Sequence, residues 1–236
     1  MKSKVVWVTG ASSGIGKAIA EKFSKEGCIV VVTARRKFRL DGIVKEIRLA
    51  DREATAFVCD VTSGRSVYST AEKIREKYGT IDLQINNAGA TVFKSFLDTE
   101  TKDYDNVIDT NLKGPFLCMK AVLPQMIKKK SGYIINILSV AANTTFENSS
   151  VYSASKSGLQ AMATCIRKEV RKHNIKICNI YPGAVETDMW DSKARQQFRK
   201  RMMSPADIGE IVFDVYNKPE RLMIEDLVVR PVRGDL

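Results

Sequence analysis

The chain has 236 residues, 44% of them apolar, and a formal net charge of +11. This apolar content is ample for a hydrophobic core and excludes a disordered chain, and no run of about 18 apolar residues is present that would span a membrane. Five scattered cysteines without a CxxC pair, together with a single histidine, argue against a disulfide framework, a zinc site and a histidine-based triad.

Short runs rich in valine and isoleucine alternate with longer segments of helical period. This alternation is typical of βαβ units that build a parallel sheet with helices on both faces. The expected strands are Val5–Thr9, Ile29–Thr33, Ala56–Cys59, Leu83–Asn86, Tyr133–Leu138, Lys176–Tyr181 and Leu227–Arg230. The expected helices are Gly16–Glu26, Phe38–Leu49, Ser66–Tyr78, Thr101–Ile127, Ser150–His173 and Pro205–Val215. We therefore predict an α/β fold with a Rossmann-like, doubly wound parallel sheet of about seven strands.

No proline- or serine-rich linker and no internal repeat divides the sequence, so we expect residues 1–236 to form a single domain. The first expected strand begins at residue 5, which leaves no room for a signal peptide and predicts a cytoplasmic protein. Residues 188–203 are polar and basic and follow the sixth expected strand. Since ligands bind beyond the carboxyl ends of parallel strands, this segment is predicted to be a substrate lid; an ordinary surface helix is the alternative.

The first expected strand leads directly into the glycine-rich sequence TGASSGIG, residues 9–16, and then into an amphipathic helix. Such glycines permit a tight turn and close approach of the backbone to a pyrophosphate, which lies at the positive end of the helix. A glycine pattern alone is a weak signal, but the required strand and helix are both present here. The residues predicted to bind a dinucleotide in this turn are Gly10, Ser12, Ser13, Gly14, Ile15 and Gly16.

The end of the second expected strand indicates which dinucleotide is bound. An NAD site usually places an acidic residue there to bind the ribose 2′-hydroxyl, but this chain has Ala34. Arg35 and Arg36 follow at once, and a guanidinium offers a fork of donors that suits a phosphate. The sequence therefore favours NADP over NAD, although a solvated basic turn is an alternative reading of the arginines.

A tyrosine and a lysine stand four residues apart in the sequence VYSASKSG, as Tyr152 and Lys156. On a helix this spacing places both side chains on one face. A neighbouring ammonium favours the phenolate and so is expected to lower the pKa of the phenol, which is about 10 in an unperturbed tyrosine. Ser139, at the end of an earlier apolar run, would supply a hydrogen bond to a substrate oxygen. An isolated pair of this kind is more often a half-buried ring beside a solvated charge.

Taken together, these elements resemble the short-chain dehydrogenase/reductase family, of the compact single-domain type. The resemblance runs from about residue 4 to residue 187. It comprises, in order, TGASSGIG, CDVT, NNAG, NLKG, Ser139, YSASK and YPGAVET. The order and spacing of these motifs are far more specific than any one of them.

The resemblance implies contacts between the chain and the adenine half of the cofactor. Asp60 is expected to contact the adenine ring, with Val61 packed beside it. The NNAG sequence is expected to support the central sheet and to line the cofactor through Asn87, Ala88 and Gly89.

The resemblance also implies contacts at the nicotinamide end. Tyr152 and Lys156 are expected to bind the nicotinamide ribose. Lys156 would therefore both hold the ribose and act on the phenol of Tyr152. Thr187 is expected to hold the carboxamide, while Pro182 and Gly183 shape the approach to it.

The implied activity is NADP-dependent interconversion of a carbonyl and an alcohol by hydride transfer. Tyr152 would act as general acid and base, Ser139 would bind the oxygen, and Lys156 would bias the phenol. Asn111 would help to position a water that relays a proton toward Lys156. A 3-oxoacyl thioester, a simple aldehyde or ketone, a sugar and a steroid are all open as substrates. The candidate pocket walls are Phe93, Val140, Ala141, Asn143, Tyr181, Met189 and Trp190.

Two other functions compete with this one. A dinucleotide-sensing regulator would keep the fold without turnover, but loss of the tyrosine or the lysine would have favoured it, and both are present. Nucleic-acid binding driven by the positive charge lacks a recognisable motif, so neither nucleic acid nor a membrane is expected as a partner. From the family we expect a homodimer or homotetramer that packs through the helices expected at 101–127 and 150–173.

Overall fold

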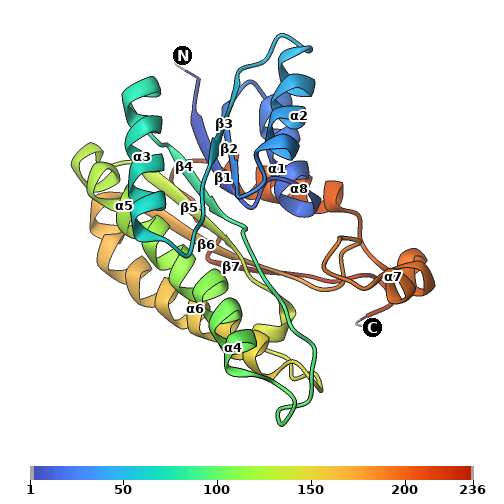
Figure 1. The fold of residues 1–236 in the computed structure, drawn as a ribbon. Coiled ribbons are helices and arrows are strands. Elements are labelled where there is room, and N and C mark those ends of the chain that lie inside the picture. The colour runs from blue at the N-terminus through green and yellow to red at the C-terminus, as the bar shows by residue number, and fades with distance from the viewer. Residues whose placement is uncertain (1–2, 235–236) are drawn as a thin grey trace.

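A computed structural model describes residues 3–234 of the chain. Its strands pair in parallel to form a seven-stranded sheet (Figure 1). The spatial order is β3-β2-β1-β4-β5-β6-β7. The strands span β1 Val5–Thr9, β2 Ile29–Ala34, β3 Ala54–Val58, β4 Leu83–Asn86, β5 Gly132–Ile137, β6 Ile175–Pro182 and β7 Asp226–Val229. The strand order reverses between β1 and β4, and in such sheets the crevice beyond the carboxyl ends at this point binds ligands. Residues 1–2 and 235–236 of the predicted domain lie outside the described residues.

Helices cover both faces of the sheet (Figure 1). On one face lie α1 (Gly14–Lys25), α2 (Lys37–Arg48) and α8 (Pro205–Tyr216), and on the other lie α3 (Gly64–Tyr78), α5 (Gly114–Lys129) and α6 (Ser150–Val170). The shorter α4 (Thr101–Ile108) and α7 (Ser192–Phe198) stand beyond the sheet. None of the helices in residues 3–234 has the length and apolarity needed to cross a membrane.

The valine-rich strands form because both of their faces are buried. In β1, Val6 and Val8 pack into the core under α1, α2 and α8, whereas Val5 and Trp7 pack into the core under α3, α5 and α6. Strands buried on both faces read as continuous apolar runs, which explains why the predicted strands lie within two residues of those observed. The predicted fold class is confirmed.

Five of the six predicted helices begin and end within three residues of those observed. The N-terminus of α8 is capped: Ser204 accepts a hydrogen bond from the Asp207 N–H, and Asp207 accepts one from the Ser204 N–H. Beyond β6, the segment predicted as a lid contains α7 and a short turn of 3-10 helix. A parallel bridge between Val185 and Met203 holds the two ends of this segment together.

Helical structure is found over the whole of the helix predicted at 101–127, but a π-helical turn at Asp109–Lys113, which was not predicted, separates α4 from α5. Asn111 lies in this turn with 1% of its surface exposed. Its side chain forms hydrogen bonds with the backbone N–H and oxygen of Ala90 and with the hydroxyl of Ser155. Such π-helical turns inside α-helices occur frequently at functional sites. Tertiary hydrogen bonds accompany this departure from the regular helical period.

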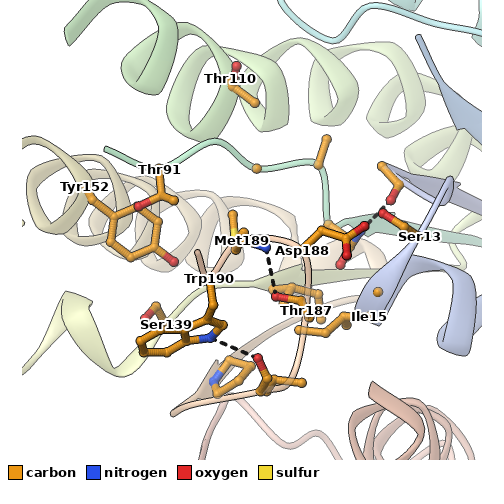
Figure 2. Close-up of a pocket in the computed structure, with 18 of the residues that line it drawn as sticks. Ser13, Ile15, Thr91, Thr110, Ser139, Tyr152, Thr187, Asp188, Met189 and Trp190 are labelled. Carbon is orange, nitrogen blue, oxygen red and sulfur yellow. Dashed lines mark hydrogen bonds between the residues drawn. The ribbon is translucent and has the colours of Figure 1, made fainter. Parts of the chain in front are cut away.

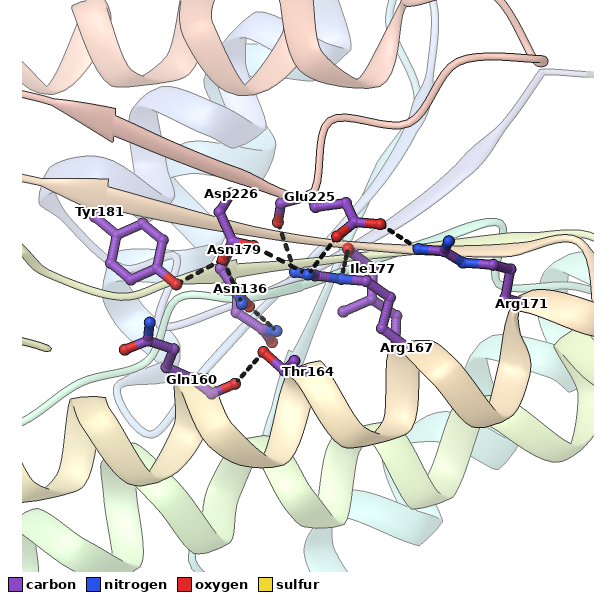
Figure 3. A network of polar contacts seen from close by, with 10 residues as sticks. All are labelled: Asn136, Gln160, Thr164, Arg167, Arg171, Ile177, Asn179, Tyr181, Glu225 and Asp226. Atoms are coloured by element: carbon purple, nitrogen blue, oxygen red, sulfur yellow. Dashed lines mark hydrogen bonds and ion pairs between the residues drawn. The ribbon is translucent and has the colours of Figure 1, made fainter. Parts of the chain in front are cut away.

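A ladder of side-chain amides crosses the sheet from β4 to β7, and Figure 3 shows its part from Asn136 to Asp226. The strand register places Asn86, Asn136, Asn179 and Asp226 side by side. Each amide nitrogen donates to the next oxygen, at 2.8 Å, 2.9 Å and 3.0 Å, and the last acceptor is the Asp226 carboxylate. Because buried polar groups are costly when unpaired, this one-way chain fixes the register of the edge strand β7.

Arg167 of α6 joins the carboxylate end of the ladder from the side (Figure 3). Its side chain is only 3% exposed, and it donates to the carboxylate of Asp226 at 3.0 Å and to the backbone oxygens of Ile177 and Glu225 at 2.9 Å and 2.6 Å. Burial acts to raise the pKa of Asp226, but hydrogen bonds from Tyr181, Arg167 and Asn179 outweigh it and lower that pKa.

Candidate active site

A cavity of about 1160 Å³ opens beyond the carboxyl ends of β1, β4, β5 and β6. Residues that were predicted from the motifs converge on it from all of these strands. The predicted site residues that line the cavity are Gly10, Ser12, Ser13, Gly14, Ile15, Arg35, Arg36, Asp60, Val61, Asn87, Ala88, Gly89, Ser139, Tyr152, Lys156, Pro182, Gly183 and Thr187. Figure 2 shows Tyr152 and Ser139 toward one end of this pocket, and Ser13 and Ile15 toward the other.

Gly16 is a predicted site residue that does not line the cavity. A Cβ atom there would lie 2.3 Å from Nδ2 of Asn87, so the glycine lets helix α1 approach the segment after β4. Asn87 donates from the same nitrogen to the backbone oxygens of Thr9 and Gly10, at 3.0 Å and 3.2 Å. Gly16 therefore shapes the glycine turn by close packing and does not itself face the cavity.

The glycine turn presents the start of α1 to the cavity. Gly10 has φ +64°, and a Cβ atom there would lie 2.6 Å from the Cα of Ala88, so only glycine fits. Ser13 precedes the helix and makes no capping hydrogen bond through its side chain. The first N–H groups of a helix seek an acceptor and carry positive partial charge, which suits an anionic ligand.

The end of the cavity beside β2 carries two neighbouring arginines. Arg35 and Arg36 follow Ala34 at the end of β2, and all three residues line the cavity. Nη2 of Arg36 donates to Oγ of Ser12 at 3.2 Å, which holds the guanidinium against the glycine turn. A phosphate at this place would meet positive charge and no carboxylate from the end of β2. The residues present therefore fit NADP.

Lys156 is buried beside Tyr152 on α6. Its Nζ lies 5.7 Å from the centroid of the Tyr152 ring and donates to the backbone oxygen of Ile137 at 2.9 Å. Burial lowers the pKa of Lys156 to about 8. Ser139, at the start of the turn after β5, accepts a hydrogen bond from the Ala141 N–H at 3.1 Å. This bond orients the serine hydroxyl in the same part of the cavity.

The expected lowering of the Tyr152 pKa is not found. Burial raises the pKa of Tyr152 above its ordinary value, and a hydrogen bond with Ser139 acts in the opposite direction without reversing the shift. Desolvation disfavours the charged phenolate, and the hydrogen bond with Ser139 does not offset this effect. The phenol is therefore protonated at neutral pH, which is the state that donates a proton.

Asn111 is the other predicted site residue that does not line the cavity. Its Oδ1 accepts from the Ala90 N–H at 2.8 Å, and its Nδ2 donates to the Ala90 oxygen at 2.8 Å and to Oγ of Ser155 at 3.0 Å. The side chain thus ties the NNAG segment to α6, three residues from Tyr152. A role for Asn111 in positioning a water stays a prediction.

The predicted pocket walls are partly correct. Phe93, Ala141, Met189 and Trp190 line the cavity. Val140, Asn143 and Tyr181 do not, and the Tyr181 hydroxyl instead donates to the carboxylate of Asp226 at 2.6 Å. The β6 strand alternates its side chains, so this tyrosine faces the ladder side of the sheet.

Several lining residues were missed by the sequence reasoning. Thr91 lies two residues after NNAG and could have been inferred from that motif; its Oγ1 is buried without a hydrogen-bond partner in the described part of the chain. Phe146 and Glu147 belong to an irregular loop and carry no sequence signal. Asp188 follows the YPGAVET motif, and it forms ion pairs with Arg39 at 3.6 Å and Arg195 at 2.8 Å.

Comparisons with known proteins agree with this arrangement. A family model described as short chain dehydrogenase matches residues 4–197. A sepiapterin reductase of Chlorobaculum tepidum is 34% identical over 98% of this chain and 98% of its own length. A metagenomic short-chain oxidoreductase solved with NADP is 33% identical with a TM-score of 0.86, and each chain is covered to 98%. The closed form of a serine dehydrogenase with NADP⁺ is 28% identical with a TM-score of 0.92, covering 98% of this chain and 96% of that one.

Proposed function

The chain belongs to the short-chain dehydrogenase family of oxidoreductases, and we propose that it uses NADP to interconvert a carbonyl and an alcohol. One observation carries the proposal. Tyr152, Lys156 and Ser139 line the same cavity as the glycine turn and the two arginines after β2. A proton donor, a buried cation and a hydroxyl therefore lie together where a dinucleotide fits.

In this proposal, each of the three side chains has a distinct task. NADPH, when bound, supplies a hydride. Ser139 donates a hydrogen bond to the carbonyl oxygen, and Tyr152 delivers a proton to it as negative charge develops there. The carbonyl carbon gains the hydride and the oxygen gains the proton, which gives the alcohol and NADP⁺. Lys156, held on the Ile137 oxygen, supplies positive charge beside the phenol.

The test of this function is oxidation of NADPH and NADH over a panel of carbonyl compounds. The panel contains aldehydes, ketones, diketones, 3-oxoacyl thioesters and sugars, and it includes sepiapterin because of the relative named above. We expect turnover with NADPH on at least one class. Faster turnover with NADH would contradict the cofactor assignment. NADP binding without turnover on any substrate would favour the dinucleotide-sensing regulator.

Loss of both arginines is expected to weaken use of NADPH selectively. In the Arg35→Ala/Arg36→Ala variant, we expect the KM for NADPH to rise about 10- to 100-fold, because charge-assisted hydrogen bonds to a phosphate are lost. The KM for NADH should change much less. Lys45→Ala is the matched control, since Lys45 is an exposed cation on α2 outside the cavity. An equal rise for both cofactors would contradict the assignment.

The pH dependence follows from the burial of Lys156. The pKa of Lys156 is lowered to about 8, so its ammonium loses the proton above about pH 8. The phenol does not titrate first, because the pKa of Tyr152 is raised. We expect kcat/KM for NADPH, which reports ionisations of the free enzyme, to fall about tenfold for each pH unit above that pKa. A flat profile to about pH 10 would contradict the role of the charged lysine.

We also propose that residues 188–203 serve as a substrate lid and that the chain assembles as a homodimer or homotetramer. The lid proposal is supported by the cavity-lining positions of Asp188, Met189 and Trp190.

Assembly is supported by two exposed aromatic residues on the outer helices, Tyr104 of α4 and Phe116 of α5. Sedimentation at micromolar concentration tests the assembly, and a strict monomer would contradict it.

A further inference from the structure

Two aromatic rings from different loops meet beside Tyr152. Phe93 follows β4, and Trp190 follows β6. Their ring centroids are 6.5 Å apart, and the ring planes differ by only 24°. The Phe93 ring is also 6.2 Å from the ring of Tyr152, at 53°. Both residues line the cavity, so the proton donor faces a nearly parallel aromatic pair.

Hydrogen bonds hold the Trp190 ring and the backbone next to Phe93. Nε1 of Trp190 donates to the Val185 oxygen at 3.0 Å, and its backbone N–H donates to the Thr187 oxygen at 3.3 Å. Next to Phe93, the backbone N–H of Lys94 donates to the Asn148 oxygen at 2.9 Å. The aromatic pair is therefore largely formed before a ligand binds, which lowers the entropy cost of binding one.

Core packing does not account for the two rings. Neither belongs to either of the two hydrophobic cores of the described chain, and Phe93 is 55% exposed. An exposed phenylalanine alone needs no explanation. Phe96 on the same loop is 77% exposed, lies outside the cavity, and has no ring partner among the described residues. Phe93 differs from it in being placed against Tyr152 and Trp190.

We infer that Phe93 and Trp190 select substrates whose carbonyl group is attached directly to a flat aromatic or heteroaromatic ring. This inference rests on the proposed carbonyl reduction at Tyr152. A carbonyl oxygen that accepts a hydrogen bond from the Tyr152 phenol holds its substituent within a few ångströms of that hydroxyl. The neighbouring surface is then the aromatic pair. Flat rings stack on such faces with a gain beyond burial of area, whereas a saturated ring of equal size gains burial alone.

The first test compares two ketones that share a carbon skeleton, acetophenone and cyclohexyl methyl ketone. Wild-type enzyme is expected to have the higher kcat/KM for acetophenone. In Phe93→Leu and Trp190→Leu, the ratio of the two kcat/KM values should fall about three- to tenfold, because leucine keeps apolar contact but cannot stack. Phe96→Leu is the matched control and should leave the ratio unchanged. An unchanged ratio in both test variants, or an equal fall in the control, overturns the inference.

The second test measures binding without turnover. The chain has two tryptophans, and Trp7 is fully buried with its Nε1 bonded to Thr33. We expect acetophenone, after inner-filter correction, to quench tryptophan emission saturably in the wild type and to lose this effect in Trp190→Leu. Saturable quenching without NADPH oxidation on any carbonyl supports the aromatic site and contradicts the reductase. Turnover without saturable quenching by acetophenone supports the reductase and overturns the inference.

Discussion

Replacing Tyr152 by phenylalanine is expected to lower kcat for NADPH-dependent carbonyl reduction by at least about a hundredfold. General acid–base help of this kind is worth roughly 10²–10⁴-fold, and the variant removes only the hydroxyl that delivers the proton. The ring would keep its contact with Phe93, and Lys156 would keep its bond to the Ile137 oxygen. We therefore expect the Kd for NADPH, measured by fluorescence titration, to change only a few fold.

The matched control is Tyr68→Phe. Tyr68 is an exposed residue on α3 outside the cavity, so loss of its hydroxyl should leave kcat unchanged. Ser139→Ala is expected to lose less activity than Tyr152→Phe, because the serine orients the oxygen but does not transfer the proton. Near-normal turnover in Tyr152→Phe would contradict the proposed mechanism, whereas equal loss in the control would indicate a general effect on folding.

Much of the candidate site could be predicted from the sequence because its residues follow buried strands. Glycine turns and short apolar runs are local signals, and a parallel sheet brings the ends of its strands to one edge. The predicted positions from Gly10 to Thr187 therefore meet at one cavity, apart from Gly16 and Asn111. What escaped prediction depends on contacts distant in sequence. In the π-turn, Asn111 forms hydrogen bonds with Ala90 and Ser155, which lie 21 and 44 residues away.

The polar ladder shows the same limit. Asn136 and Asn179 interrupt apolar strands, so the sequence contains a signal that something polar is buried. Their partners follow only from the register of four strands. The same register explains why Tyr181 bonds Asp226 and was wrongly placed in the pocket. The direction of the Tyr152 pKa shift also required the structure, because burial is a tertiary property.

Replacing Arg167 by methionine is expected to destabilise the protein by about 3 kcal/mol, because the Arg167 side chain is only 3% exposed and its loss leaves buried hydrogen-bond acceptors without their donor. Methionine keeps much of the volume, but the Ile177 and Glu225 backbone oxygens lose their donor. Arg171→Met is the control: Arg171 pairs with the side chain of the same Glu225 but is 58% exposed, and exposed pairs contribute about 0–1 kcal/mol. Urea unfolding measures both, and equal midpoints for the two variants would contradict the prediction.

The free energy of unfolding, measured as the pH is lowered, gives an independent check on the same network. The pKa of Asp226 is lowered in the fold by its hydrogen bonds, so its contribution is complete above the ordinary carboxyl pKa of about 4 and is lost as the pH falls through the lowered value. Arg167→Met removes one cause of that shift. The stability difference between wild type and Arg167→Met should therefore be constant near neutral pH and shrink below about pH 4. A difference that is unchanged at acid pH would assign the effect to lost packing instead of charge.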